Sequence, residues 1–232
     1  MATLTTPKAV TAAGASRLIE RFMPHADITE CHEVLVRAPA ALVFDVARNL
    51  DMQSIPLVRA IFWLRAKLLR ATEPPARPRG LVAETTALGW AILAERPGRE
   101  VVVGSATQPW KGDVVFRPVE PDRFVAFAEP EMVKIVWTLE AEPLGPALTR
   151  FRTETRVLAT DEAARTQFRR YWRWAGWGVV LIRKLLLWAL RGEAKRESLH
   201  HSSASGQRNP GSRSSPSSVP SGPTTESLPS AR

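Results

Sequence analysis

The chain has 232 residues, of which 44% are hydrophobic and 24% charged, the balance of an ordinary globular protein. Its single cysteine, Cys31, excludes an intramolecular disulfide framework and a cysteine-based zinc cluster, and we expect neither a metal nor a cofactor. The formal net charge of +9 is uneven, with +2 over residues 1–160 and +5 over residues 161–197. Because most of the predicted body is nearly neutral, the charge does not favour a nucleic-acid partner.

Both ends of the chain differ in composition from the middle. Residues 198–232 contain 12 Ser, 5 Pro and 3 Gly, too few apolar groups to offset the cost of ordering, so we predict a disordered tail. We predict a largely disordered extension over residues 1–24, with a short helix that Pro24 ends. Residues 1–15 lack the apolar core of a secretory signal, and we expect a cytoplasmic protein. Residues 25–197 then form one domain.

The elements of this domain follow a simple order. The pattern predicts a strand over residues 28–37, helices over 40–49 and 54–69, and a proline-rich loop over 73–80. Strands are then predicted over residues 81–88, 90–95, 100–107, 124–128, 133–141 and 148–158. A long helix begins after Thr160 or Asp161 as its N-cap. This order predicts an α+β fold.

The long helix needs an apolar surface to cover, so we expect it to lie across the sheet. Its first apolar stripe consists of Phe168, Trp172, Ala175, Val179, Ile182 and Leu186. Two interior glycines, Gly176 and Gly178, weaken the helix by about 1 kcal/mol each relative to alanine, and we expect a kink there.

The joint between the first strand and the first helix carries a family resemblance. Residues 34–44 read Val-Leu-Val-Arg-Ala-Pro-Ala-Ala-Leu-Val-Phe, and this joint, with the order of elements over 27–197, resembles the START-like or SRPBCC superfamily. That superfamily includes Bet v 1-like, polyketide cyclase/dehydratase and lipid-transport proteins. Further phrases resemble a bacterial branch with no agreed chemistry, at residues 54–65, 153–157, 168–172 and 181–183. The resemblance implies a helix-grip fold, with a curved antiparallel sheet around the C-terminal helix and an apolar cavity between them.

Alternation along the strands selects the side chains that face this cavity. If Val34 and Val36 point inward, His32 points the same way, either as a ligand-binding or acid–base group or as a satisfied core histidine. In the last strand Thr153 and Thr155 share the apolar side, where their hydroxyls bond to neighbouring groups or to a ligand. The opposite, charged side is expected to face solvent, with Glu154 in a weak ion pair; it carries Arg150, Arg152, Glu154 and Arg156.

These patterns predict a ligand cavity lined by seven residues: His32, Trp90, Trp137, Phe151, Thr153, Thr155 and Trp172. Trp137 is either part of the core or a stacking platform. The expected function is binding of a small hydrophobic ligand of the lipid, isoprenoid, polyketide-like or aromatic kind. The alternative is a cyclase/dehydratase-type enzyme in the same cavity, although no motif of hydrolases, nucleotide-binding proteins or zinc proteases occurs and no catalytic residue is assigned.

A second apolar stripe follows the long helix, formed by Trp174, Trp177, Leu181, Leu185 and Trp188. Arg169, Arg173 and Lys184 flank it. Charged residues near the centre of residues 174–190 exclude a transmembrane segment. The stripe therefore predicts association through the outer helix face, with an anionic membrane surface or in a homodimer, unless the domain itself covers it.

Overall fold

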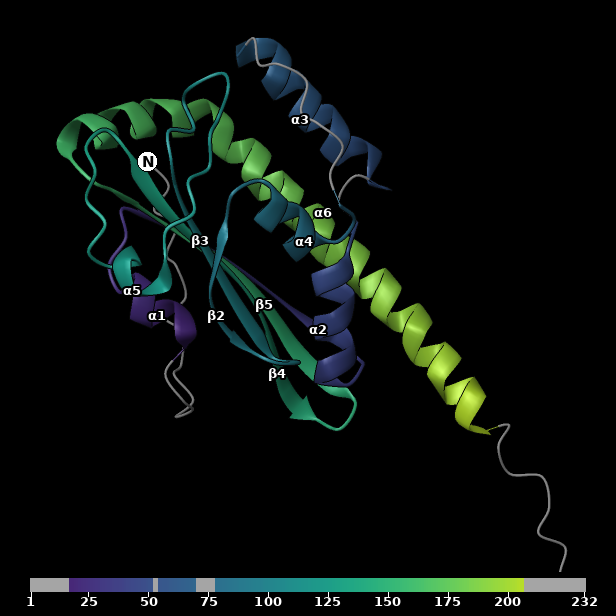
Figure 1. Ribbon diagram of the computed structural model, residues 1–232. Coiled ribbons are helices and arrows are strands. Elements are labelled where there is room, and N and C mark those ends of the chain that lie inside the picture. The colour runs from purple at the N-terminus through teal and green to yellow at the C-terminus, as the bar shows by residue number, and fades with distance from the viewer. Residues whose placement is uncertain (1–16, 52–53, 70–77, 207–232) are drawn as a thin grey trace, which may run out of the picture.

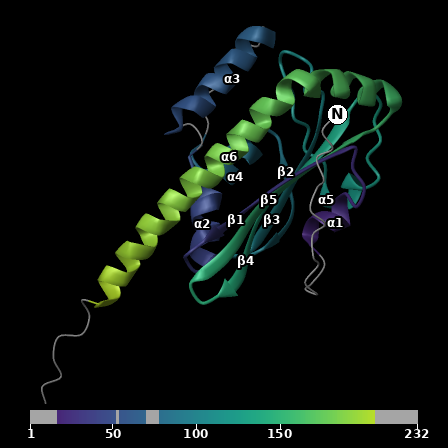
Figure 2. The same cartoon turned by 180° about the vertical axis from the view of Figure 1, so that it is seen from behind.

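The computed structural model describes residues 17–51, 54–69 and 78–206. Within these ranges the chain forms one five-stranded antiparallel sheet in the order β1-β5-β4-β3-β2, with helices on both faces (Figures 1 and 2). The predicted α+β fold, a curved antiparallel sheet with a long C-terminal helix across it, is confirmed. Of the segments predicted to be disordered, 1–24 and 198–232, residues 1–16 and 207–232 lie outside the described residues, as do residues 73–77 of the proline-rich loop.

The strands are β1 (Ile28–Val36), β2 (Ala91–Arg96), β3 (Glu100–Thr107), β4 (Val133–Gly145) and β5 (Leu148–Ala159). The helices are α1 (Leu18–Phe22), α2 (Ala40–Asn49), α3 (Pro56–Leu69), α4 (Leu81–Ala87), α5 (Pro121–Phe124) and α6 (Glu162–Gly206). The helix α6 therefore continues through residues 198–206, which the composition had assigned to the tail.

The two faces of the sheet are covered by different helices. The inner face, as we call it, packs against α2, α4 and α6: Phe151 and Trp137 share a buried cluster with Leu190 of α6. The outer face packs against α1 and α5, where Ile19 and Phe124 are fully buried. In Figure 1, α1 and α5 lie on one side of the strands and α2, α4 and α6 on the other.

The long helix begins where its sequence predicts. Asp161 accepts a hydrogen bond from the backbone N–H of Ala164 at 2.7 Å, which is the geometry of an N-cap. The ribbon of α6 then bends part-way along (Figure 1), as expected for a helix with two interior glycines. A Cβ built on Gly178 would lie 3.5 Å from Cγ2 of Ile61, so this glycine is where α3 approaches α6.

Two predicted strands are wrong. Residues 81–88 form the helix α4, because burial of Leu81, Val82 and Glu84 against α2 outweighs the apolar run that suggested a strand. Residues 124–128 pair with no strand in the described ranges: the helix α5 ends at the buried Phe124, and Val125 is exposed. The other predicted strands are confirmed, with β4 and β5 longer than expected because they continue to the hairpin pair Gly145–Leu148.

The charged side of β5 was predicted to face solvent, and for its central residues this is wrong. Glu154 is 3% exposed and Arg156 8% exposed, because α1 lies over them. Glu154 accepts hydrogen bonds from Arg156 at 2.7 Å and from Arg17 at 2.6 Å. The residues around α1, expected to form an extension outside the domain, thus contribute to its core and to a buried ion-pair network.

Candidate ligand-binding site

Strand pairing brings four of the predicted cavity residues together on the inner face. His32 of β1 lies opposite Thr153 of β5, and Thr155 of β5 lies opposite Trp137 of β4. Residues paired across antiparallel strands project to the same side, and their neighbours Val34 and Phe151 pack toward α6. The structure therefore has these four side chains on the inner face of the sheet, the orientation predicted from the alternation.

One hydrogen bond fixes the centre of this group. The indole Nε1 of Trp137 donates to Oγ1 of Thr153 at 2.9 Å, with both residues buried. Burial of an indole N–H requires such a partner. The bond orients the Trp137 ring across β4 and β5 and gives the Thr153 hydroxyl, which lies among bulky apolar residues, a buried partner.

The same face carries two ionisable groups at β1. Nε2 of His32 lies 3.9 Å from Oε2 of Glu30, and their side chains are 18% and 30% exposed. The sheet is therefore more open at β1 than at β4, where Trp137 is 8% exposed. Because Glu30 pairs with Thr155, the two ionisable groups and the two threonines form one polar band, consisting of Glu30, His32, Thr153 and Thr155.

Apolar clusters lie on both sides of this polar band. One contains Phe151 and Trp137, with Trp90 packed against it and its ring 5.2 Å from that of Phe116. The other surrounds the beginning of α6, where the rings of Trp172 and Phe168 are 5.5 Å apart. Trp90 and Trp172 thus belong to different clusters, and the structure does not bring all seven predicted residues into one group.

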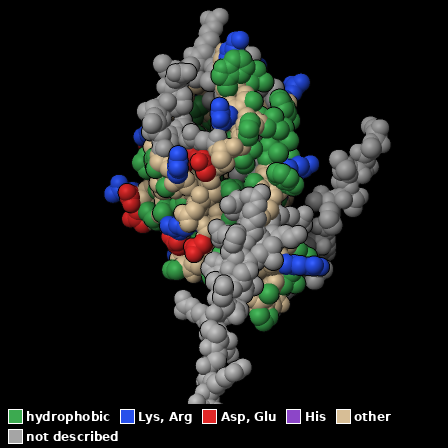
Figure 3. Space-filling model, turned by 90° about the vertical axis from the view of Figure 1, so that its right-hand side faces the viewer, with side chains coloured by type: hydrophobic (Ala, Val, Ile, Leu, Met, Phe, Trp, Pro, Cys, Tyr) green, Lys and Arg blue, Asp and Glu red, His purple; other side chains and the backbone are tan. Residues whose placement is uncertain are grey.

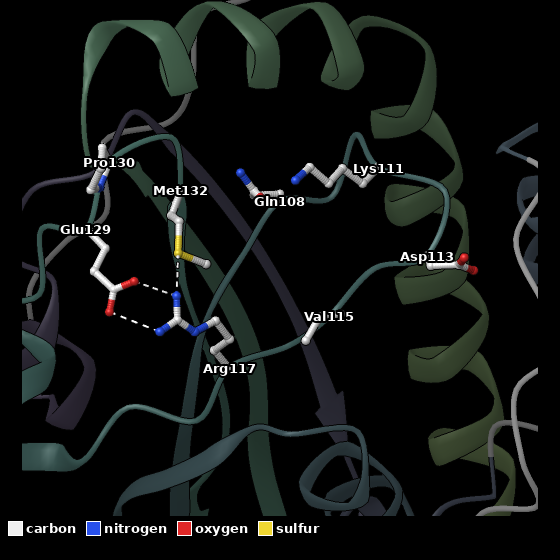
Figure 4. Close-up of a pocket in the computed structure, with 8 residues that line it drawn as sticks. All are labelled: Gln108, Lys111, Asp113, Val115, Arg117, Glu129, Pro130 and Met132. Carbon is white, nitrogen blue, oxygen red and sulfur yellow. Dashed lines mark hydrogen bonds and ion pairs between the residues drawn. The ribbon is translucent and has the colours of Figure 1, made fainter.

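A cavity among the described residues lies apart from this group. It has a volume of about 300 Å³ and is lined by Gln108, Lys111, Asp113, Val115, Arg117, Glu129, Pro130 and Met132, none of which was predicted. Figure 4 shows the Arg117 guanidinium turned toward the Glu129 carboxylate, which accepts from Arg117 Nη2 at 3.0 Å. Its one arginine is therefore paired with a carboxylate, and charged and polar side chains line it together with Val115, Pro130 and Met132, unlike the predicted apolar cavity.

The predicted association residues are largely at the surface. Trp177 and Trp188 are 60% and 77% exposed, and the side chains of Arg169, Arg173 and Lys184 are exposed too. Leu181 and Leu185 are half-buried, and the side chain of Trp174 lies outside the described part of the structure.

Sequence reasoning missed the outward face of α3, where Leu57, Trp63 and Leu64 are exposed. Apolar residues occur on more than one face of this helix, and only one face can pack on the domain. That pattern is the sequence signal for an exposed apolar surface. In the described ranges, no group of three or more His, Cys, Asp or Glu is placed to hold a metal ion. None of the helices described is long and apolar enough to cross a membrane.

No family model matches the chain, and no curated protein matches its sequence. Among solved structures, the hypothetical protein jhp0584 from Helicobacter pylori has a TM-score of 0.39 and 11% identity, covering 80% of this chain and 99% of that one. The Zhui aromatase/cyclase from Streptomyces sp. R1128 has a TM-score of 0.28 and 18% identity, covering 74% and 95%. Ara h 8.0201 has a TM-score of 0.27 and 11% identity, covering 73% and 98%.

Proposed function

We propose that this protein binds a small, largely apolar ligand on the inner face of its sheet, beneath α6, with the polar band of β1 and β5 orienting one polar end of the ligand. The observation that carries the proposal is the placement of His32, Thr153 and Thr155 between two apolar clusters. Ligand sites in proteins have this character: mostly apolar walls with a few convergent polar groups.

Each side chain has a part in this proposal. Thr153 is engaged by the Trp137 indole, so it holds the floor of the site in place. His32, with its partly exposed imidazole, stands at the open edge and offers a hydrogen bond to the ligand. Phe151 and Trp172 belong to the apolar clusters on either side.

Native mass spectrometry of the freshly purified protein, followed by organic extraction, tests the proposal by identifying a co-purifying compound. Displacement of a bound fluorescent fatty acid by that compound then measures how tightly the protein binds the compound. The variants His32→Ala and Thr155→Val should weaken binding about tenfold, the loss of one hydrogen bond in a dry site. The control Leu35→Ala changes an outward-facing, 54% exposed residue of the same strand and should bind as the wild type does. Equal binding by all three variants would rule out the inner face.

A second candidate, a cyclase/dehydratase-type reaction in the same site, is favoured by one observation. Such chemistry needs two ionisable groups that converge, and His32 Nε2 and Glu30 Oε2 lie 3.9 Å apart. Incubating the extracted compound with the protein and measuring its mass separates the two functions. Loss of water from the compound, abolished by Glu30→Gln with binding retained, indicates an enzyme; an unchanged compound indicates a binding protein.

A further inference from the structure

Two helices that pack on one another present large apolar side chains to solvent. On α3, Leu57, Trp63 and Leu64 are 46%, 63% and 49% exposed. On α6, Trp177 and Trp188 are 60% and 77% exposed. Because α3 approaches α6 at Gly178, the two helices are neighbours, and we call their exposed residues together the α3–α6 surface. A soluble monomer seldom leaves so many large apolar groups uncovered together.

The exposed arc of α6 is separate from the face that it turns to the sheet. At about 100° per residue, Trp177, Leu181, Lys184 and Trp188 fall within an arc of roughly 60°. Leu187 and Leu190, which pack into the inner-face cluster, point well away from that arc. The exposed arc is therefore separate from the inner-face cluster.

The charged residues of α3 and of residues 163–192 of α6 are all positive. No Asp or Glu occurs between Asp51 and Glu73, or between Glu162 and Glu193, although both stretches contain several Arg and Lys. Among the cations with described side chains, Lys67 lies with Nζ 5.0 Å from the centre of the Trp63 ring, and Lys184 shares the exposed arc of α6. Figure 3 shows hydrophobic side chains with Lys and Arg among them over one part of this side of the molecule, with the acidic side chains gathered in another.

We propose that the α3–α6 surface docks on an anionic lipid membrane, with Trp63, Trp177 and Trp188 inserted at the level of the headgroups. Tryptophan and aliphatic side chains rimmed by lysine and arginine are the composition of interfacial helices. A second copy of the chain fits less well, because a two-fold dimer through this surface would set its cations against themselves. Leu57 and Leu64 add exposed aliphatic area. This favours a lipid over a nucleic acid, because nucleic acids are bound through positive charge and stacking on aromatic rings.

Vesicle flotation of the full chain tests the docking, since it requires no ligand on the inner face. The protein should float with phosphatidylcholine vesicles that contain phosphatidylserine, remain unbound with phosphatidylcholine alone, and be released by salt. The double variants Trp63→Ser/Trp188→Ser and Lys67→Glu/Lys184→Glu should each lower the vesicle partition coefficient at least about tenfold. For the charge variant, two cations at about 1 kcal/mol each already exceed the roughly 1.4 kcal/mol of a tenfold change.

Matched controls use exposed residues that lie outside these two helices. Val115→Ser/Val125→Ser changes two side chains that are 68% and 54% exposed, and Lys111→Glu/Arg123→Glu makes the same change of charge as the test variant. Both controls should float as the wild type does. The docking proposal is overturned if the wild type does not bind phosphatidylserine vesicles, or if the controls lose binding as the test variants do. It is also overturned if light scattering shows a dimer that Trp63→Ser/Trp188→Ser dissociates.

Discussion

Arg156 in β5 holds both carboxylate oxygens of Glu20 in α1, a residue 136 positions earlier in the chain, with Nη1 at 2.9 Å and Nη2 at 2.5 Å. The hydrogen bonds that Arg156 donates to Glu20 keep the pKa of Arg156 above its usual value and lower the pKa of Glu20. Arg156 also donates to the backbone oxygen of Met23 at 2.6 Å. One guanidinium thus ties the N-terminal helix to the sheet.

The apolar side of α1 should contribute strongly to stability. Ile19 is fully buried among Val102, Val136 and Phe22, so Ile19→Ala should cost about 2–5 kcal/mol of the free energy of unfolding. Urea unfolding at neutral pH measures the loss. Arg21→Ala, an exposed position in the same helix, is the control and should cost less than about 1 kcal/mol. Equal, small losses at both positions would mean that α1 is not held on the sheet.

Replacing the buried acid of the network should also destabilise the protein. Glu154→Gln removes the charge that faces Arg17 and Arg156, and breaking a buried pair from one side costs about 3–5 kcal/mol. The measurement is the same urea titration. Glu142→Gln, whose carboxylate pairs with Arg150 at the surface, should change stability by less than about 1 kcal/mol. A similar loss for the two variants would contradict the burial of the network.

The network also predicts acid sensitivity. Burial opposes ionisation of Glu154, but hydrogen bonds from Arg156 and Arg17 hold its pKa below the usual 4.5, as Arg156 does for Glu20. Because these pKa values are lowered in the folded state, the stability that the two carboxylates contribute is present above about pH 4.5 and is lost as the pH falls through the lowered values. Burial and the nearby Glu140 raise the pKa of Glu100, which acts in the opposite sense and offsets part of the loss.

Urea titrations between about pH 6 and pH 3 measure this loss. The wild type should lose stability steadily over that range. Glu154→Gln, although less stable at neutral pH, should lose less on acidification because one of the two responsible carboxylates is gone. Parallel curves for the two proteins would show that Glu154 is not held ionised by its arginines.

The Trp137–Thr153 bond can be tested by removing either partner. Thr153→Val keeps the side-chain shape but leaves the buried indole N–H without its acceptor, so it should cost about 1–3 kcal/mol. Adding Trp137→Phe removes that N–H, and a double-mutant cycle should show coupling between the two changes. Thr29→Val, at an exposed position of β1, is the control and should be close to neutral. Additive losses would mean that the bond contributes nothing.

Gly104 in β3 is required by close packing on the outer face. A Cβ at this position would lie 2.5 Å from Cδ1 of Leu93 and 2.7 Å from the ring of Phe124. Gly104→Ala should therefore lower the melting temperature markedly, at a cost of about 1–3 kcal/mol. Gly145→Ala is the control, because no atom lies within 4 Å of the added methyl group. If Gly104→Ala melts at the same temperature as Gly145→Ala, then α5 and β2 can move to admit the methyl group at little cost in free energy.

The sequence by itself determined the features that depend on local periodicity and capping. Alternation along β1 and β5 placed His32 and Thr153 on the same face, and the acid at Asp161 marked the beginning of α6. These patterns are reliable because a one-residue shift in a strand would turn its whole apolar set away from the core. The long apolar helix also required a sheet to cover, which fixed the α+β architecture.

Tertiary contacts decided what local pattern did not. The run Leu81–Ala87 became a helix because α2 offered its apolar side chains a surface. The charges of Glu154 and Arg156 became buried because Arg17 and Glu20, distant in sequence, lie over them, and nothing in an alternating strand indicates which of its faces another segment will cover. Burial of a charge is a property of its partners in space, so only the folded chain could show that the polar side of β5 is part of the core.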